Sequence, residues 1–557
     1  MPVIELSHVT KRWGGFYGVD DLSMTIADNA FVTLLGPSGC GKTTTLRMIA
    51  GLETPTSGRI TIGDRVVFDS DKGIDVPANK RRVGFLFQNY ALWPNMTVHK
   101  NISFGLANID EELPVVDDQA VRAAGMLRAL SNPAELVQAI AECRDKKGKL
   151  DQARARIKLI DLFEVSMSAA KELLGLGLHE AADPVAAAQP AHDKWSGVLY
   201  QARTRHHAAG EELNARFEVV RDGQVVTAKR KLSAEEIDLR VRRVARIVKI
   251  GPFMDRYPSE LSGGQQQRVA IARTLAPEPA VLFMDEPLSN LDAKLRLEMR
   301  SELQRLHVDT GSTFVYVTHD QMEAMTLATR ICLMDNGVLQ QYDAPLDVYN
   351  KPNNLFVADF VGNPSINFID AKGRQGIDGG IGLTLLGGHQ ARFMPRDSFS
   401  VQQWYVEQDQ ADAEADAAEK EKLTHKGTVE KENKESNFRY RVSLVDTPET
   451  TEDVVWTDED FVIGVRPQFI DIDPNGTIPA EIYSSMPTGM ETTVRVRIGN
   501  HLLTGVMFGG AIYELGQQVR LRISSDSIML FSRRNGRLIA QGSLVPAAEP
   551  ERDLVGV

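Results

Sequence analysis

Two stretches of the chain, residues 1–107 and 237–369, alternate short apolar runs with segments of helical spacing. The continuous apolar run at 31–35 predicts a buried strand, and the spacing of apolar residues over 44–52 predicts an amphipathic helix directly after it. Strand patterns that alternate with helical ones are typical of mixed α/β domains. We therefore predict an α/β fold for both stretches.

The intervening residues 108–236 have a different pattern, rich in alanine, leucine and balanced charge. Two parts of this segment carry apolar residues at helical spacing. The pattern predicts helices over 121–140 and 150–176, a loop over the Ala/Pro-rich 181–191, and a hairpin over 215–231 with Asp222-Gly223 in its turn. The segment is thus predicted to be a mainly helical insertion.

From residue 370 to 557 the alternation of apolar and polar positions predicts a β-rich domain. Gly499-Asn500 lies between two such runs and predicts a hairpin turn. Residues 407–422 are acidic and alanine-rich without a core pattern, which predicts an acidic loop or a short exposed helix.

Composition narrows the possible classes of protein. A chain of 557 residues suggests about three domains. The net charge of -12 argues against nucleic-acid binding through a broad basic face. Cys40, Cys143 and Cys332 are far apart and lack metal-ligand spacing, which argues against a disulfide framework or a zinc site.

The sequence shows no export or membrane-spanning signal. The N-terminal residues contain no basic segment followed by an apolar run, so we expect no signal peptide. No run approaches the roughly 18 to 20 apolar residues that cross a bilayer. If the protein acts at a membrane, another chain must provide the span.

The most informative motif is the phosphate-binding pattern G-x-x-x-x-G-K-[ST], present as Gly36-Pro37-Ser38-Gly39-Cys40-Gly41-Lys42-Thr43. It lies between the predicted strand and helix, where backbone N–H groups and the helix dipole face phosphate oxygens. Lys42 is placed to neutralise the β- and γ-phosphates, and the Thr43 hydroxyl to ligate Mg²⁺. A nucleoside triphosphate with Mg²⁺ is the expected ligand.

Two other strand patterns end in candidate catalytic residues. The apolar run at 280–284 ends in Asp285 and Glu286. Asp285 is suited to hold Mg²⁺ through water and Glu286 to polarise the attacking water, although an acidic turn is the alternative. His319 follows the strand pattern at 313–318, an edge where ligands bind in α/β sheets, and is suited to bond the γ-phosphate and the attacking water.

A second anion site is predicted at Leu261-Ser262-Gly263-Gly264-Gln265, before a helix over about residues 266–275. Ser262 is a good N-cap, and the glycines expose the first N–H groups of the helix. An ordinary capped helix is the alternative. One nucleotide carries one triphosphate, so a second such site requires an explanation.

The order of these motifs resembles that of the ATP-binding cassette (ABC) ATPases. Gln88 and the segment Ser289-Asn290-Leu291-Asp292 complete the set. Short stretches similar to the importer ATPases of the maltose and oligosaccharide type lie at 9–14, 88–94, 257–260, 356–360 and 464–467. The resemblance is strong over 1–107 and 237–370 and looser over about 460–540.

The resemblance implies a P-loop, RecA-like ATPase core with antiparallel β and helical subdomains, plus a C-terminal OB-like β-domain. The implied domains are the first part of the cassette at 1–107, the insertion at 108–236, the second part of the cassette at 237–369, and the β-rich domain at 370–557. Family members form a head-to-tail dimer in which the LSGGQ segment of one subunit caps the γ-phosphate held by the other. This accounts for the second anion site.

Roles for further residues also follow from the resemblance. Trp13 matches the aromatic position that stacks on adenine, although Phe16 and Tyr17 nearby make a packing role the alternative. Thr44 belongs to the ATP-binding loop, and Gln88 matches the residue that touches Mg²⁺ and the water. Asp292, with the rest of its segment, orders the dimer interface.

The chain departs from the family at residues 108–236, where relatives have a short linker. The insertion begins just after the Gln88 segment, in the subdomain that faces the membrane subunits in relatives. A contact with the transporter or a regulatory partner and a tolerated surface elaboration both stay open.

We predict an ATP-hydrolysing importer subunit, peripheral to the cytoplasmic face of the cell membrane. Its predicted partners are a second ATPase subunit, integral permease subunits and, indirectly, an extracytoplasmic binding protein, with no nucleic acid. A sugar or oligosaccharide is the predicted cargo. Importers of anions, iron, polyamines or glycerol phosphate are alternatives, and a soluble ABC ATPase that transports nothing is disfavoured because the chain has one cassette and no heptad run.

Overall fold

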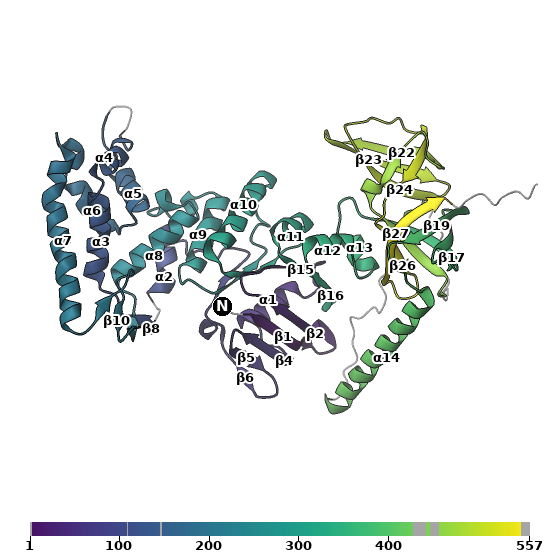
Figure 1. Cartoon of the computed structure of the whole chain (residues 1–557), viewed down its shortest axis with the longest axis horizontal. Coiled ribbons are helices and arrows are strands. Elements are labelled where there is room, and N and C mark those ends of the chain that lie inside the picture. Colours follow the sequence, from purple (N-terminus) through teal and green to yellow (C-terminus); the bar gives the residue numbers. More distant parts are fainter. Residues whose placement is uncertain are drawn as a thin grey trace, which may run out of the picture. The chain divides into compact units, whose positions relative to one another are not determined.

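The computed structural model describes residues 3–107, 110–144, 148–426, 440, 442–445 and 456–546. The chain divides into two compact units, whose elements are labelled in Figure 1. Unit 1 contains residues 27–29 and 77–317, and unit 2 contains residues 3–26, 30–76 and those from 318 onward.

Unit 2 contains the predicted antiparallel β subdomain. Its strands lie in the order β2-β1-β4-β5-β6, and β1 pairs with β2 from Ile4↔Ile26 to Trp13↔Phe16. The strands are β1 (Ile4–Trp13), β2 (Phe16–Ile26), β4 (Ser57–Ile62), β5 (Arg65–Asp69) and β6 (Ile74–Asp75).

A parallel strand pair carries the phosphate loop. β3 (Phe31–Leu35) is buried throughout and pairs in parallel with β15 (Arg330–Asp335), which pairs antiparallel with β16 (Val338–Asp343). The predicted strand at 31–35 is confirmed. Helix α1 (Lys42–Ala50) begins two residues earlier than predicted, because Gly41, the last glycine of the loop, is its N-cap.

The short helices α12 (Pro345–Asn350) and α13 (Leu355–Phe360) connect this sheet to the β-rich domain, while α11 (Gln321–Leu327) precedes β15. Arg466 from the β-rich domain is 1% exposed and donates hydrogen bonds to the carbonyl oxygens of Tyr349, Ala358 and Val361. Burial lowers the pKa of Arg466 to about 10, so it stays charged at neutral pH. One buried cation, Arg466, thus ties α12 and α13 to the β-rich domain.

The β-rich domain combines a barrel with a second sheet. The closed barrel has the order β17-β18-β19-β27-β26-β20 and agrees with the predicted OB-like domain. Its strands are β17 (Asn367–Gln375), β18 (Ile381–Leu385), β19 (His389–Pro395), β20 (Asp460–Val465), β26 (Ile528–Ser532) and β27 (Leu538–Pro546).

The second sheet has the order β21-β25-β22-β23-β24. The Ile498↔His501 register confirms the predicted turn at Gly499-Asn500. The strands are β21 (Ile470–Ile472), β22 (Ile478–Pro487), β23 (Glu491–Ile498), β24 (His501–Phe508) and β25 (Gln518–Ile523).

Residues 407–422, predicted to form an acidic loop or a short exposed helix, are helical, so the loop prediction is wrong. These residues belong to helix α14 (Val401–Lys426), which starts beside the barrel (Figure 1). The helix contains no glycine or proline and is rich in good helix formers. Its apolar anchors Val401 and Tyr405 precede the acidic run, so a pattern sought inside that run misses them.

Unit 1 contains a parallel set of strands and the helical subdomain. β13 (Val281–Asp285) lies between β7 (Val83–Leu86) and β14 (Thr313–Val317), parallel to both. Helix α9 (Gly263–Leu275) packs against β7, and α2 (Val98–Leu106) and α8 (Ala234–Ile247) pack against α9. Helix α10 (Ala293–Thr310) follows β13 in the chain.

The insertion in unit 1 is mainly helical, as predicted, but its helices are shorter. Asn132 and Pro133 start a new helix within 121–140, and Glu164 with φ +52° ends one within 150–176. The helices are α3 (Asp118–Leu130), α4 (Pro133–Ala141), α5 (Gln152–Phe163), α6 (Met167–Gly175) and α7 (Pro184–Ala208).

The predicted loop at 181–191 is wrong, because most of it forms the start of α7. Asp183 caps the helix, and Pro184 stands at its first position, where the missing N–H has no intrahelical partner to lose. Pro190 stands within the first two turns of this helix. The loop prediction failed at Pro184 because proline is tolerated in the first turn of a helix, whereas Pro190 lies inside the helix and removes one backbone N–H donor.

Short strands close the insertion. β8 (Asp110–Pro114) pairs antiparallel with β12 (Thr227–Lys231), so the two ends of the insertion are joined. The predicted turn at Asp222-Gly223 is confirmed between β10 (Val219–Arg221) and β11 (Gln224–Val225), and β9 (Glu212–Leu213) completes this sheet.

Asp117 joins two helices of the insertion. Its Oδ1 accepts the N–H of Ala120 and caps α3, while its Oδ2 accepts hydrogen bonds from Arg205 and His206 of α7. Burial alone raises the pKa of Asp117, but the hydrogen bonds outweigh it and hold the pKa below its ordinary value. The side chain therefore stabilises the insertion as an anion.

We expect Asp117→Asn to destabilise the insertion by about 1–3 kcal/mol at pH 7, because the amide still caps α3 but no longer offers a charged carboxylate to Arg205 and His206. A depressed carboxyl pKa stabilises the fold above the unfolded pKa of about 4, and this is lost as the pH falls through the folded value. Hydrogen exchange of α3 and α7 should be measured in urea from pH 7 downward. The difference in protection between wild type and Asp117→Asn should shrink below about pH 4. Asp193→Asn, an exposed change on α7, is the control; equal protection of wild type and Asp117→Asn at pH 7 would contradict the prediction.

Among the described residues, no helix has the length and apolar character that a membrane crossing requires.

Candidate functional site

The phosphate loop in unit 2 is held in one tight conformation. Gly36 and Gly41 have φ values of +149° and +102°. A Cβ atom on Gly36 would lie 2.2 Å from the carbonyl oxygen of Met334, and one on Gly41 would lie 2.3 Å from that of Gly18. The close backbone packing therefore requires glycine at both positions. The loop backbone forms a preshaped cradle.

Lys42 lies within this cradle. Its side chain is 6% exposed, and its Nζ donates to the carbonyl oxygens of Gly36 and Pro37 at 2.8 and 2.7 Å. Among the described residues no side chain caps α1 at its N-cap residue, Gly41. A buried ammonium beside a helix N-terminus fits the phosphates of a nucleotide.

Contacts from distant segments support the loop. The N–H of Gly337 donates to the carbonyl of Cys40, and the N–H of Asp20 donates to the carbonyl of Gly337. Burial raises the pKa of the Cys40 thiol, so it stays protonated at neutral pH. Sequence reasoning missed Gly18 and Gly337, because no local motif marks a residue that packs against the loop from another strand.

Trp13 ends β1 and is 48% exposed. The Lys11 ammonium lies 5.2 Å from the ring centroid, and Phe16 approaches it at 6.4 Å in a tilted arrangement. This exposure favours a stacking surface over a core packing role. The contact with adenine stays a prediction.

His319 is exposed and follows Thr318, whose backbone N–H donates to the carbonyl of Leu34 at the end of β3. The Thr318 hydroxyl donates to Glu323 at 2.7 Å, and Asp320 caps α11. These bonds fix the backbone on both sides of His319. Within unit 2, the histidine therefore lies beside the entry to the phosphate loop.

Unit 1 brings Gln88 and Glu286 together. Gln88 Nε2 donates to Glu286 Oε2 at 3.2 Å. Asp285 is the buried last residue of β13, and Glu286 takes a left-handed conformation with φ +45°. The N–H of Glu286 donates to the carbonyl of Val317 at 3.1 Å, which holds this turn at the end of the strands.

The segment after Glu286 holds Gln88 and Glu286 in place through hydrogen bonds. Asn290 Nδ2 donates to the backbone carbonyl of Gln88, and the Ser289 hydroxyl donates to that of Glu286. Asp292 accepts the N–H of Leu295 and caps α10. Ser289 and Asn290 therefore fix the positions of the predicted catalytic side chains, a function that the motif alone did not reveal.

Arg273 is a supporting residue that the sequence analysis missed. From α9, its guanidinium donates to the carbonyl oxygens of Tyr90 and Ala91 at 2.7 and 2.6 Å. Both of these residues have positive φ values, +60° and +46°. Arg273 thus holds the strained segment after Gln88, and its distance along the chain leaves no local signal.

The signature segment forms the start of α9. Ser262 and Gln265 make a reciprocal capping box. Gly263 is exposed, while a Cβ on Gly264 would lie 2.7 Å from a methyl of Leu295. The helix therefore begins at Gly263, three residues before the predicted start, with its N-terminus at the surface.

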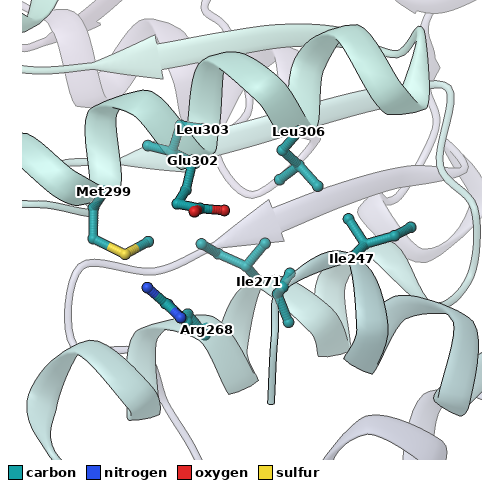
Figure 2. Close-up of a pocket in the computed structure, with 8 residues that line it drawn as sticks. Ile247, Arg268, Ile271, Met299, Glu302, Leu303 and Leu306 are labelled. Atoms are coloured by element: carbon teal, nitrogen blue, oxygen red, sulfur yellow. The ribbon is translucent and has the colours of Figure 1, made fainter. Parts of the chain in front are cut away.

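A cavity elsewhere in unit 1 does not suit a nucleotide. It measures about 20 Å³ and lies between α9, α10 and the end of α8. Figure 2 shows Ile271 and Leu306 facing it, with Arg268 and Glu302 alongside. This volume admits about one water molecule.

Comparison with known proteins identifies relatives of the cassette. Residues 19–176 and 188–289 match the family described as ABC transporter. The trehalose/maltose import ATP-binding protein MalK of Thermococcus litoralis is 37% identical over 371 residues, covering 67% of each chain. The sn-glycerol-3-phosphate import ATP-binding protein UgpC of Rhizobium meliloti is 34% identical over 371 residues, 66% of this chain and 70% of the relative.

Similar structures include a dimeric post-hydrolysis state of an ATP-binding cassette bound to ADP and Pi. It is 22% identical, has a TM-score of 0.35, and matches 61% of this chain and 98% of its own.

Proposed function

The chain belongs to the ABC transporter family, and on that premise we propose that it is the ATP-hydrolysing subunit of a solute importer. ATP binding, dimerisation and hydrolysis would drive a conformational change in separate membrane subunits. The observation that carries this proposal is that the chain contains both a phosphate cradle around Lys42 and a surface-exposed LSGGQ helix start. A cassette that closes only as a dimer needs both.

The residues of unit 2 suit the binding of ATP. Lys42 and the N-terminus of α1 balance the charge of the phosphates, and Trp13 offers an exposed ring to the base. We assign Thr43, Gln88 and, through water, Asp285 to the retention of Mg²⁺. When bound, Mg-ATP supplies the γ-phosphoryl group and a metal that neutralises its oxygens.

The residues of unit 1 suit the activation of water. Glu286 is the candidate general base, and Gln88 Nε2 orients its carboxylate through the 3.2 Å contact. His319 is the candidate donor to the γ-phosphate, and Asp292 orders the dimer interface. The signature residues Ser262 to Gln265 act on the nucleotide held by the second subunit of the dimer.

We infer that the cargo is a sugar or oligosaccharide, because relatives such as MalK carry names that specify sugar import. Glycerol phosphate is the second candidate, since UgpC is similar to this chain to nearly the same degree. In this proposal the chain binds integral permease subunits at the cytoplasmic face of the membrane, where ATP is available. An extracytoplasmic binding protein would deliver the cargo.

Affinity purification from native membranes, joined to a Mg²⁺-dependent ATPase assay, tests the proposal. We expect permease subunits to co-purify with the chain, and ATP hydrolysis to stop when Mg²⁺ is chelated. A Glu298→Gln variant, changed on the exposed surface of α10, serves as the control. Recovery of the active chain without any membrane subunit would overturn the transport assignment.

A further inference from the structure

Besides the small cavity in unit 1, a cavity of about 460 Å³ lies in unit 2, lined by residues outside the phosphate loop. Its walls come from β16, from the loop before α13, from α14 and from the start of β27. A volume of this order is typical of small-molecule sites in proteins. α14 contributes Trp404 and Gln408 to the lining.

Amide side chains dominate the polar part of the lining. Gln340, Asn353, Asn354 and Gln408 all line the cavity. Some of their atoms are engaged: Gln340 Oε1 accepts from Asn354 Nδ2, and Asn353 Nδ2 donates to the backbone carbonyl of Gln340. For Gln340 Nε2, Asn353 Oδ1 and Gln408 Nε2, the described part of the chain supplies no hydrogen-bond partner. These groups are available to a ligand as donors and an acceptor.

The charge of the lining is already balanced. Among the described residues that line the cavity, Arg537 is the one with a charged side chain. Its Nη2 donates to Asp412 Oδ1 at 2.6 Å and its Nη1 to Gln408 Oε1 at 2.5 Å, both on α14. An anion would have to displace this carboxylate, so the site favours a neutral ligand.

One aromatic ring and aliphatic side chains form the rest of the wall. Trp404 of α14 lines the cavity, together with Leu339 and Leu538. A tryptophan presents a flat apolar face with a polar N–H at its edge. A flat apolar surface beside amide groups matches a ring that carries C–H groups on its face and hydroxyl groups around its edge.

The cavity is built from segments that are already fixed. The Tyr405 hydroxyl of α14 donates to Ser532 Oγ at 3.0 Å, which anchors the helix to the barrel. The N–H of Leu538 donates to the carbonyl of Asn353, and that of Leu355 donates to the carbonyl of Gly536. Walls fixed before binding lower the ordering cost of taking up a ligand.

We propose that this cavity is a binding site for a neutral, polyhydroxylated small molecule of the size of a mono- or disaccharide. Trp404 supplies the platform for the ring, while Gln340, Asn353 and Gln408 bond its hydroxyl groups. The site is separate from the nucleotide site and does not depend on the transport assignment. A ligand there bridges α14 to β16, and so links the β-rich domain to the sheet that carries the phosphate loop.

Calorimetric titration of the full chain with glucose, maltose and trehalose tests the site, with glucose 6-phosphate as the anionic counterpart. We expect at least one neutral sugar to bind with a dissociation constant of about 1 mM or tighter. Trp404→Ala and, separately, Asn353→Ala should each weaken this binding about tenfold or more. Asn353 is exposed, so its variant tests the site even if the loss of Trp404 disturbs α14.

Two control variants distinguish binding in this cavity from binding elsewhere on α14 or at the nucleotide site. Gln403→Ala changes an exposed residue of α14 outside the cavity and should bind the sugar like wild type. Lys42→Ala, which alters the nucleotide site, should also leave sugar binding unchanged. The proposal is overturned if no neutral sugar binds at about 10 mM, if both cavity variants bind like wild type, or if glucose 6-phosphate binds more tightly than glucose.

Discussion

Replacing Glu286 with glutamine should leave ATP binding intact and lower ATP hydrolysis by about 10² to 10⁴-fold, the usual contribution of a general base. The amide is isosteric, and its oxygen can still accept the hydrogen bond from Gln88 Nε2. The backbone bond to Val317 is unaffected by the change, so the turn keeps its position. Only the basicity of the side chain is lost.

The same variant should accumulate dimers in the presence of ATP, because nucleotide that is not hydrolysed keeps the two subunits closed. Single-turnover kinetics and size-exclusion chromatography with ATP measure the two effects. Glu298→Gln makes the same chemical change on exposed α10 and should hydrolyse ATP and elute like wild type. Turnover of Glu286→Gln within a few-fold of wild type would remove Glu286 from the catalytic role.

Replacing Lys42 with alanine should lower the affinity for ATP about 100-fold or more and abolish measurable turnover. Removal of a charged hydrogen-bond donor from a largely buried site costs about 1.5–3 kcal/mol per bond, and Lys42 is the cation inside the cradle. Lys42→Arg should not restore binding, because the forked guanidinium does not fit a space shaped for a compact ammonium.

Equilibrium dialysis with labelled ATP measures this effect. Lys72→Ala, which removes an exposed cation from the turn after β5 in the same unit, should bind ATP like wild type. Melting temperatures of the two alanine variants show whether any loss of binding arises from unfolding. ATP affinity of Lys42→Ala near that of wild type would contradict the assigned role of the loop.

Features defined by contiguous residues were predictable from the sequence. The strand at 31–35 and the turns at Asp222-Gly223 and Gly499-Asn500 form where the patterns indicate, because each depends on neighbours a few residues away. The signature helix starts at a capping box formed by Ser262 and Gln265, three positions apart. Helix boundaries were less predictable: α7 includes prolines, and α14 includes an acidic run that lacks a core pattern.

The sequence by itself determined the family motifs, their order and the type of ligand, because a phosphate loop or a capped helix is specified by a short run of residue types. The tertiary structure alone decided which distant residues hold these motifs in place. Gly18 packs against Gly41, Arg273 holds the segment after Gln88, and Arg466 joins α12 and α13 to the β-rich domain. Such contacts depend on how segments far apart in the chain pack together, and no local spacing encodes them. The polar cavity beside α14 arises in the same way, from four segments that only the fold brings together.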